Sequence, residues 1–117
     1  MRYLEKLRAA QEMNQSWLCV GLDPQPEFMP VEAAKWDEPV LPFNRRIIEA
    51  TADLVCAYKP NLGFYLQWGA AGVIALERTI AVIPDHIPII LDAKIGDIGN
   101  TQEAWGRGLF DEWGVDA

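Results

Sequence analysis

The sequence predicts an α/β fold organised around a parallel sheet, because short apolar runs alternate with longer amphipathic segments along its 117 residues. Residues 87–91 are almost entirely apolar, as expected for a strand of a parallel sheet whose two faces are both covered. Right-handed connections between such strands give either a doubly wound sheet or a (β/α)₈ barrel. The pattern supplies about three β/α units, whereas a barrel needs eight strands and about 250 residues. We therefore expect residues 1–117 to form an incomplete α/β domain.

The chain is expected to begin with an amphipathic helix over residues 2–14, where leucines are spaced among charged side chains. Residues 17–22 are predicted to form the first strand. Five of the eight prolines follow within residues 24–42, which predicts a long loop with at most short helical turns. A helix over residues 43–53 comes next, with Asn44 or a neighbouring residue as its N-terminal cap.

Residues 54–58 are predicted as the second strand, and a helix over residues 65–83 should follow it. Gly69 and Gly72 lie inside this helix, where we expect them to permit close packing. The apolar run at residues 87–91 is then the third strand.

The last predicted helix starts at Asn100, because Glu103 three residues later would complete a capping box. The helix should run to Trp113 and stop at Gly114. Residues 115–117 look like the beginning of a fourth strand. A sheet that stops there has an unpaired apolar edge, which is an aggregation hazard. We therefore expect the C-terminal half of the domain to be missing from this sequence.

Composition and charge exclude several classes of function. The formal net charge of -7 argues against nonspecific nucleic-acid binding, which needs clustered basic residues, although a phosphorylated small molecule needs only a local basic pocket. Cys19 and Cys56 lie in apolar runs and are expected to be buried free thiols, so no metal site is predicted. The sequence has no apolar signal core and no stretch of transmembrane length. We expect a cytoplasmic protein without a membrane partner.

Charged residues follow each of the three predicted strands. Asp23 ends the first strand, Lys59 ends the second, and Asp92, Lys94 and Asp97 follow the third. Ligands bind at the carboxyl ends of the strands in parallel α/β folds, so these side chains should converge on one site. Asp92 and Lys94 are two residues apart, so in an extended backbone their side chains point to the same side. Lys59 and Asp97 would extend them into an alternating Lys-Asp-Lys-Asp array.

Such an array suits a reaction that expels an anionic group and then protonates the carbon that is left behind. A fixed carboxylate beside a substrate carboxylate raises the energy of the ground state, and this repulsion is relieved as carbon dioxide leaves. An adjacent ammonium stabilises the developing carbanion and supplies the proton. The alternative is that these residues are ordinary solvated loop residues, or an exposed ion-pair cluster that contributes little stability.

Residues 92–101 read D-A-K-I-G-D-I-G-N-T and resemble the D-x-K-x-x-D-I-G-N-T signature of orotidine 5′-monophosphate decarboxylases. Leu18–Pro24 and Tyr58–Tyr65 resemble the first strand and the end of the second strand in the same family. The Pro-rich loop is similar to that of the longer bacterial subfamily, in which arginine often replaces Ile95. The resemblance implies that residues 1–117 are the N-terminal part of a TIM (β/α)₈ barrel, an incomplete orotidine 5′-phosphate decarboxylase domain.

The resemblance also implies a reaction and a role for each site residue. Enzymes of this family convert orotidine 5′-phosphate to UMP in de novo pyrimidine biosynthesis, without a metal ion or an organic cofactor. Asp23 would bind the sugar or the pyrimidine of the nucleotide, and Lys59 would bind the ribose and orient Asp92. Asp92 would oppose the substrate carboxylate, and Lys94 would be the proton donor.

A second chain is implied as well. Asp97, Ile98 and Thr101 would reach the active site of the neighbouring subunit in a homodimer, so that Asp97 completes the catalytic set. The family's phosphate-binding arginine and its closing loop belong to the C-terminal half of the barrel. Because remote phosphate contacts supply binding energy for closure and catalysis, we expect residues 1–117 alone to have little or no decarboxylase activity.

Two alternatives stay open. The first is a magnesium-dependent sugar-phosphate decarboxylase or aldolase of the same suprafamily, which shares the D-x-K-x-x-D region. The continuation Ile98–Thr101 favours the orotidine enzyme over this alternative. The second is a non-catalytic fragment of a truncated barrel, which would associate through its exposed sheet edge.

Overall fold

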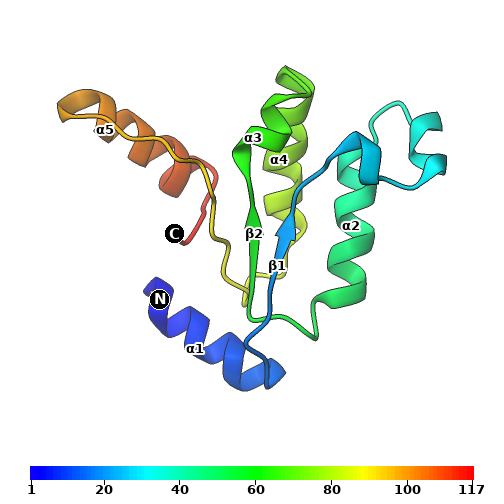
Figure 1. Cartoon of the computed structure of the whole chain (residues 1–117). Coiled ribbons are helices and arrows are strands. Elements are labelled where there is room, and N and C mark those ends of the chain that lie inside the picture. Colours follow the sequence, from blue (N-terminus) through cyan, green and yellow to red (C-terminus); the bar gives the residue numbers. More distant parts are fainter.

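The computed structural model describes residues 1–117, with the exception of the side chain of Ala34. A parallel pair of strands, β1 (Cys19–Leu22) and β2 (Ala57–Pro60), lies at its centre. Figure 1 shows these strands side by side with the helices arranged around them. The predicted α/β class with a parallel sheet is confirmed.

The segment predicted as the third strand runs parallel to β2, although it forms only isolated bridges with it. These bridges pair Tyr58 with Ile89 and Asn61 with Asp92. Between them the N–H of Ile90 donates a hydrogen bond to the carbonyl of Tyr58 at 2.9 Å. The third segment therefore lies next to β2, on the side away from β1.

Residues 115–117 lie along the other edge of the third segment, where the fourth strand is predicted. The N–H of Leu91 donates to the carbonyl of Ala117 at 2.7 Å, and the N–H of Asp116 donates to the carbonyl of Ile89 at 2.9 Å. The extended segments are thus neighbours in the order in which they occur in the sequence. This is the order of successive strands in a (β/α)₈ barrel.

The N-terminal helix α1 (Tyr3–Asn14) confirms the predicted helix and lies across the end at which the strands begin (Figure 1). The side-chain amide of Asn14 donates to the carbonyls of Ala52 and Val55 at 2.9 and 2.8 Å. The prediction of the second strand at residues 54–58 is therefore early. The side chain of Asn14 thus occupies carbonyls that precede β2, and the register of β2 with β1 runs from Ala57.

The helix α2 (Val40–Thr51) begins before its predicted start at residue 43. The carboxylate of Glu38 accepts hydrogen bonds from the first two N–H groups of the helix at 2.9 and 3.0 Å, and so caps it. Pro42 falls in the first turn, where its missing N–H costs no helical hydrogen bond. The predicted cap at Asn44 is wrong, because Asn44 lies inside the helix and is fully buried.

The predicted helix over residues 65–83 is divided into α3 (Leu62–Leu66) and α4 (Ala70–Val82). Gly69 separates the two helices with a φ of 67°, a left-handed conformation that favours glycine. No atom lies within 4 Å of a Cβ built at Gly69, so the packing role predicted for it is wrong. Gly72 does permit close packing, because a Cβ there would lie 1.9 Å from a backbone oxygen of α3.

The helix α5 (Gly99–Gly106) continues into a π-helix, η3 (Arg107–Glu112), and α5 extends away from the strands in Figure 1. The predicted capping box is wrong, because Asn100 lies within the helix and Ile98 precedes its first residue. Gly114 has a φ of 69°, which agrees with its predicted role as the residue that stops the helix.

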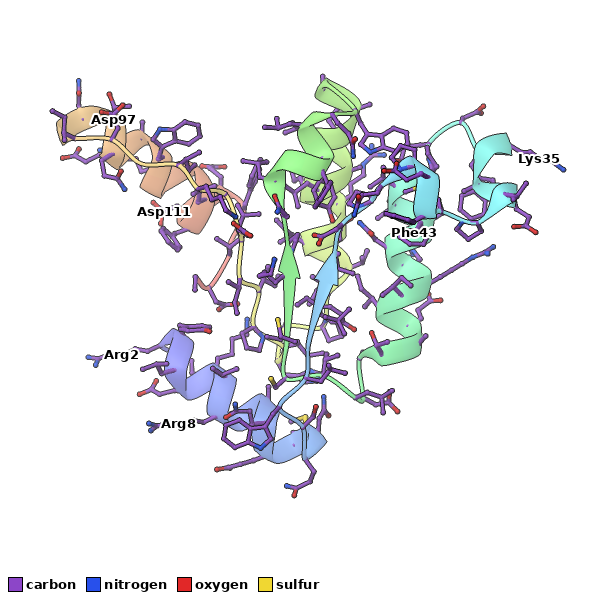
Figure 2. The ribbon with its side chains drawn as sticks, in the orientation of Figure 1. Arg2, Arg8, Lys35, Phe43, Asp97 and Asp111 are labelled. Carbon is purple, nitrogen blue, oxygen red and sulfur yellow. The ribbon has the colours of Figure 1, made fainter. Side chains whose placement is uncertain are left out.

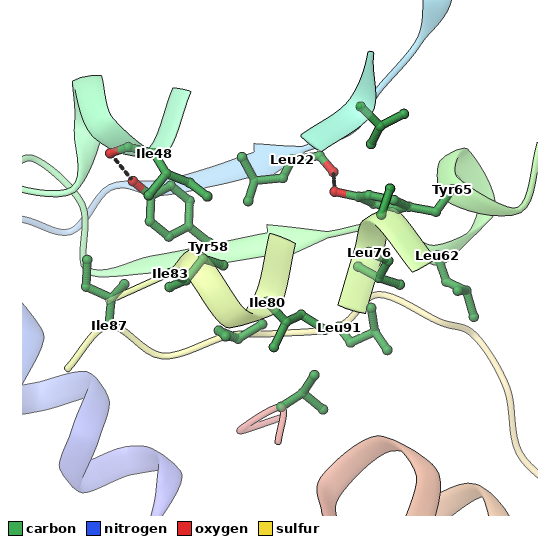
Figure 3. Close-up of a cluster of buried hydrophobic side chains, with 14 of the residues drawn as sticks. Leu22, Ile48, Tyr58, Leu62, Tyr65, Leu76, Ile80, Ile83, Ile87 and Leu91 are labelled. Atoms are coloured by element: carbon green, nitrogen blue, oxygen red, sulfur yellow. Dashed lines mark hydrogen bonds between the residues drawn. The ribbon is translucent and has the colours of Figure 1, made fainter. Parts of the chain in front are cut away.

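The hydrophobic core lies between the sheet and the helices α2 and α4. Figure 3 shows its side chains, which include Leu22, Ile48, Tyr58, Leu76 and Ile87. Two short 3₁₀ helices occur in the Pro-rich segment, as predicted, and they are η1 (Pro26–Phe28) and η2 (Val31–Lys35).

Of the two thiols that were expected to be buried, Cys56 is buried and Cys19 is exposed. Cys19 is exposed because its side chain belongs to the face of β1 opposite the core, together with the exposed Gly21. No helix in the described part of the chain is long and apolar enough to cross a membrane.

The close approach at Gly72 gives the first prediction. Gly72→Ala should destabilise the protein by about 1–3 kcal/mol, because the new methyl group would meet backbone atoms of α3 that cannot move aside. The measurement is the free energy of unfolding of the protein expressed from the complete gene. Gly106→Ala is the control, because a Cβ at Gly106 meets no atom within 4 Å. Equal stability of the two variants would contradict the prediction.

Candidate functional site

The candidate site lies on the face of the sheet opposite the core, at the carboxyl ends of the extended segments. Tyr58 points into the core, so its neighbour Lys59 points to the opposite face. Leu22 is aligned with Pro60, and Asn61 is aligned with Asp92. This register brings the ends of the three segments to one level, as the sequence predicts.

Asp92 lies between two lysines that come from different parts of the sequence. Its Oδ2 is 3.4 Å from Nζ of Lys59, and its Oδ1 accepts a hydrogen bond from Nζ of Lys94. The ammonium of Lys94, and then that of Lys59, lowers the pKa of the Asp92 carboxyl from its ordinary value. The predicted Lys-Asp-Lys part of the array is therefore formed, with Asp92 as its anionic centre.

Lys94 reaches Asp92 through a backbone conformation that the sequence does not reveal. Its φ is 51°, in the left-handed region that non-glycine residues adopt only rarely. The expectation of an extended backbone from Asp92 to Lys94 is therefore wrong, although the two side chains do meet. Such conformations persist where the surrounding structure holds them, and they are found often at functional sites.

Asp97 does not join the array within this chain. In Figure 2 it lies at the outer end of α5, away from the strand ends. Its Oδ1 accepts from the N–H of Ile98 at 2.8 Å, and its own N–H donates to Oε1 of Gln102 at 2.8 Å. Asp97 and Thr101 are exposed, and 85% of Ile98 is exposed. These three residues form an outward-facing group at the start of α5.

Asp23 follows β1 and carries a polar atom that no described group satisfies. Its Oδ1 is buried and has no hydrogen-bond partner. A Cβ at Gly21 would lie 3.2 Å from Oδ2 of Asp23, so the glycine leaves room for this carboxylate. A buried acceptor without a partner is costly, and a donor group of a ligand would satisfy it.

Sequence reasoning missed a buried polar group beneath Asp23, on the core side of the sheet. The hydroxyl of Tyr65 donates to the carbonyl of Leu22 at 2.7 Å and accepts from the side-chain amide of Asn44 at 3.0 Å. The sequence does contain a signal that Asn44 is buried, and this signal is its spacing. Asn44 lies four residues from both Val40 and Ile48, which are buried on the same face of α2.

A cavity in the described part of the chain lies elsewhere. It has a volume of about 580 Å³ and is lined by the Pro-rich segment and by Trp68, but by none of the predicted site residues. The ionised groups and this cavity therefore lie in different places, and the ionised groups form the candidate site. The cluster around Asp92 has the charges that a reaction needs, whereas the lining of the cavity is mostly apolar.

Comparison with known proteins identifies relatives over almost the whole chain. Residues 16–117 match the family described as the orotidine 5′-phosphate decarboxylase / HUMPS family. The orotidine 5′-phosphate decarboxylase of Thermomicrobium roseum is 55% identical over 117 residues, and that of Herpetosiphon aurantiacus is 55% identical over 119 residues. The alignments cover 100% and 98% of this chain but 42% and 43% of the relatives. The chain thus spans less than half of their length.

Two solved structures show a similar arrangement. The crystal structure of a Toxoplasma gondii protein named as orotidine-monophosphate decarboxylase has a TM-score of 0.89 and 42% identity, and the match covers 98% of this chain and 39% of that one. The structure of Leishmania donovani OMP decarboxylase has a TM-score of 0.80 and 34% identity, with 99% and 42% covered. The chain belongs to the orotidine 5′-phosphate decarboxylase / HUMPS family, and its fold is the N-terminal part, about three β/α units, of a TIM barrel.

Proposed function

We propose that this chain supplies the catalytic strand ends of an orotidine 5′-phosphate decarboxylase, which forms UMP in pyrimidine biosynthesis. The observation that carries the proposal is the carboxylate of Asp92, held between the ammonium groups of Lys59 and Lys94. The family and the relatives named as orotidine 5′-phosphate decarboxylases support the choice of substrate.

The charges of the cluster fit the steps of a decarboxylation. The lowered pKa keeps Asp92 anionic at neutral pH, so it opposes a substrate carboxylate placed beside it. The bond between the pyrimidine ring and its carboxylate breaks, carbon dioxide leaves, and the electron pair remains on the ring carbon. Lys94 then transfers a proton from Nζ to that carbon, and its positive charge stabilises the developing carbanion.

The remaining side chains of the site would bind the nucleotide. Lys59 contacts Asp92 and is only partly buried, so its ammonium can orient Asp92 and also donate to ribose hydroxyls. The buried Oδ1 of Asp23 offers an acceptor for a donor of the sugar or the pyrimidine. We propose no metal ion and no organic cofactor for this reaction.

We further propose a homodimer in which Asp97, Ile98 and Thr101 enter the site of the neighbouring subunit. The support is their position, because all three are exposed at the start of α5 and away from the cluster of their own chain. The outward-facing Ile98 side chain would be covered in such a dimer. A cytoplasmic location remains a prediction from the sequence.

The proposed activity belongs to the whole protein rather than to residues 1–117. The chain covers 42% of the length of its Thermomicrobium roseum relative, and the remaining strands of a barrel would complete the site. We propose that the groups that bind the substrate phosphate lie in that remainder, and that the chain described here is an incomplete domain.

The assignment of Lys94 gives a direct test. In the protein expressed from the complete gene, Lys94→Ala should lower kcat for orotidine 5′-phosphate by about 10²–10⁴-fold, because the proton donor is lost. Binding of UMP should stay measurable by calorimetry. Lys35→Ala is the matched control, since Lys35 is an exposed lysine of η2 outside the cluster. Substantial turnover by the Lys94 variant would remove the proposed role.

The shared residues of the proposed dimer can be tested by mixing subunits. Lys94→Ala and Asp97→Ala should each be inactive alone, because each lacks one part of every site. Co-refolded at equal amounts, they should recover roughly a quarter of the wild-type activity, since half of the dimers are mixed and each mixed dimer has one intact site. If the mixture stays inactive while mixed dimers form, Asp97 does not act in the partner's site.

A magnesium-dependent sugar-phosphate decarboxylase or aldolase is the second candidate, because enzymes of that kind resemble this chain in the D-x-K-x-x-D region at residues 92–97. EDTA should leave the decarboxylation of orotidine 5′-phosphate unchanged, because Asp92 and the lysines carry the proposed chemistry without a metal ion. Turnover that is abolished by EDTA and restored by magnesium would favour the second candidate. The measurement is the initial rate before chelation, after chelation and after magnesium is returned.

A further inference from the structure

The backbone around Asp23 is held in place by hydrogen bonds that three successive carbonyl groups accept. The carbonyl of Leu22 accepts from the hydroxyl of Tyr65 at 2.7 Å, and the carbonyl of Asp23 accepts from the N–H of Gln25 at 2.9 Å. The carbonyl of Pro24 accepts from the indole Nε1–H of Trp68 at 3.1 Å. Two of these donors are aromatic side chains from α3 and the turn that follows it.

The hydroxyl of Tyr65 is itself fixed by a buried network. Asn44 donates from Nδ2 to the Tyr65 hydroxyl and to Oγ1 of Thr79, both at 3.0 Å. All three side chains are fully buried. Burial raises the pKa of the Tyr65 hydroxyl, so this hydroxyl stays protonated and can donate to Leu22 over the whole working pH range. Helices α2 and α4 are thereby connected to the end of β1.

The carboxylate of Asp23 depends on this backbone for its direction. Its Oδ1 is buried and has no partner among the described residues, so no hydrogen bond fixes that oxygen. Carbonyls held on both sides of a residue fix where its Cα–Cβ bond points. A ligand that donates to Asp23 would meet a side chain whose Cβ is already in place and whose carboxylate is buried at one oxygen, which reduces the entropic cost of binding.

We propose that Tyr65, supported by Asn44 and together with Trp68, positions Asp23 for binding of the nucleotide. Tyr65 does not touch the substrate in this proposal and acts only through the carbonyl of Leu22. The inference rests on the proposed function, because it assumes that Asp23 contacts the nucleotide.

Tyr58 offers a matched comparison, because it is also a fully buried tyrosine of the core. Its hydroxyl donates to the carbonyl of Ile48 at 3.3 Å and lies 2.7 Å from Oγ1 of Thr51, so both partners belong to α2. Figure 3 shows the contrast, with the hydroxyl of Tyr65 at the carbonyl of Leu22 and that of Tyr58 at α2. Only one of these two tyrosines is connected to the end of β1.

The test compares Tyr65→Phe with Tyr58→Phe in the protein expressed from the complete gene. Both variants should lower Tm, because each removes a hydrogen bond of a buried hydroxyl. Only Tyr65→Phe should raise KM for orotidine 5′-phosphate and Kd for UMP, by about fivefold, which is the effect of one hydrogen bond. Its kcat should change less than its KM, and its Kd should be measured well below its Tm.

A double-mutant cycle then shows whether Tyr65 acts through Asp23. In an Asp23→Asn background, Tyr65→Phe should cause little further increase in the Kd for UMP, because the oriented carboxylate is already lost. If Tyr65→Phe does not fold, Trp68→Phe should raise the Kd for UMP in the same direction but by less, since it removes the indole donor to Pro24 and leaves the side-chain amide of Gln67, at 3.2 Å, as a donor to that carbonyl.

Three outcomes would overturn the inference. The first is an unchanged KM and Kd in Tyr65→Phe while the wild-type protein decarboxylates the substrate, which leaves the proposed function intact. The second is an equal rise in KM in the Tyr58 and Tyr65 variants, which indicates a general effect of core damage. The third is a wild-type protein that neither decarboxylates orotidine 5′-phosphate nor binds UMP, which removes the proposed function as well.

Discussion

The parallel register of β1 and β2 is the constraint on which the rest of the structure depends. Side chains alternate between the two faces of a strand, so a shift of one residue would exchange the core face and the site face. In the observed register Tyr58 points into the core and Lys59 points to the opposite face, where it meets Asp92 of the third segment. The same alignment packs the hydrophobic core and assembles the charged cluster.

The two faces of the sheet provide different environments, one buried and one close to water, and a hydrogen bond at the end of β1 connects them. The core face excludes water, and there Nδ2 of Asn44 donates to Tyr65 and Thr79, while Oδ1 of Asn44 is buried without a partner among the described residues. The other face holds ions near water, where the lysines stabilise the anionic form of Asp92. The hydroxyl of Tyr65 joins the two regions, because the carbonyl that it binds belongs to the residue before Asp23.

Several local features of the fold are decided by single residues, against the pattern of the segment around them. The carboxylate of Glu38 starts α2 early and leaves Pro42 in its first turn, so a proline that predicts a loop lies in a helix. A continuous apolar pattern predicts one helix where Gly69 divides α3 from α4. Lys94 takes a left-handed conformation in a segment that reads as extended. In each case a single residue overrides a propensity that is averaged over many residues.

The sequence by itself determined the α/β class, the succession of strands and helices along the chain and the family signature at residues 92–101, because periodicity and motif spacing are local properties of the chain. It also identified Asp92 with Lys59 and Lys94, since strand ends converge in any parallel sheet. Only the tertiary structure decided that Asp97 lies apart from them within this chain, and that Asn44 is a buried partner of Tyr65 rather than a helix cap. Those facts depend on how distant segments pack together. The spacing of Val40, Asn44 and Ile48 indicates that Asn44 lies on a buried face, but it does not indicate which side chain Asn44 meets there.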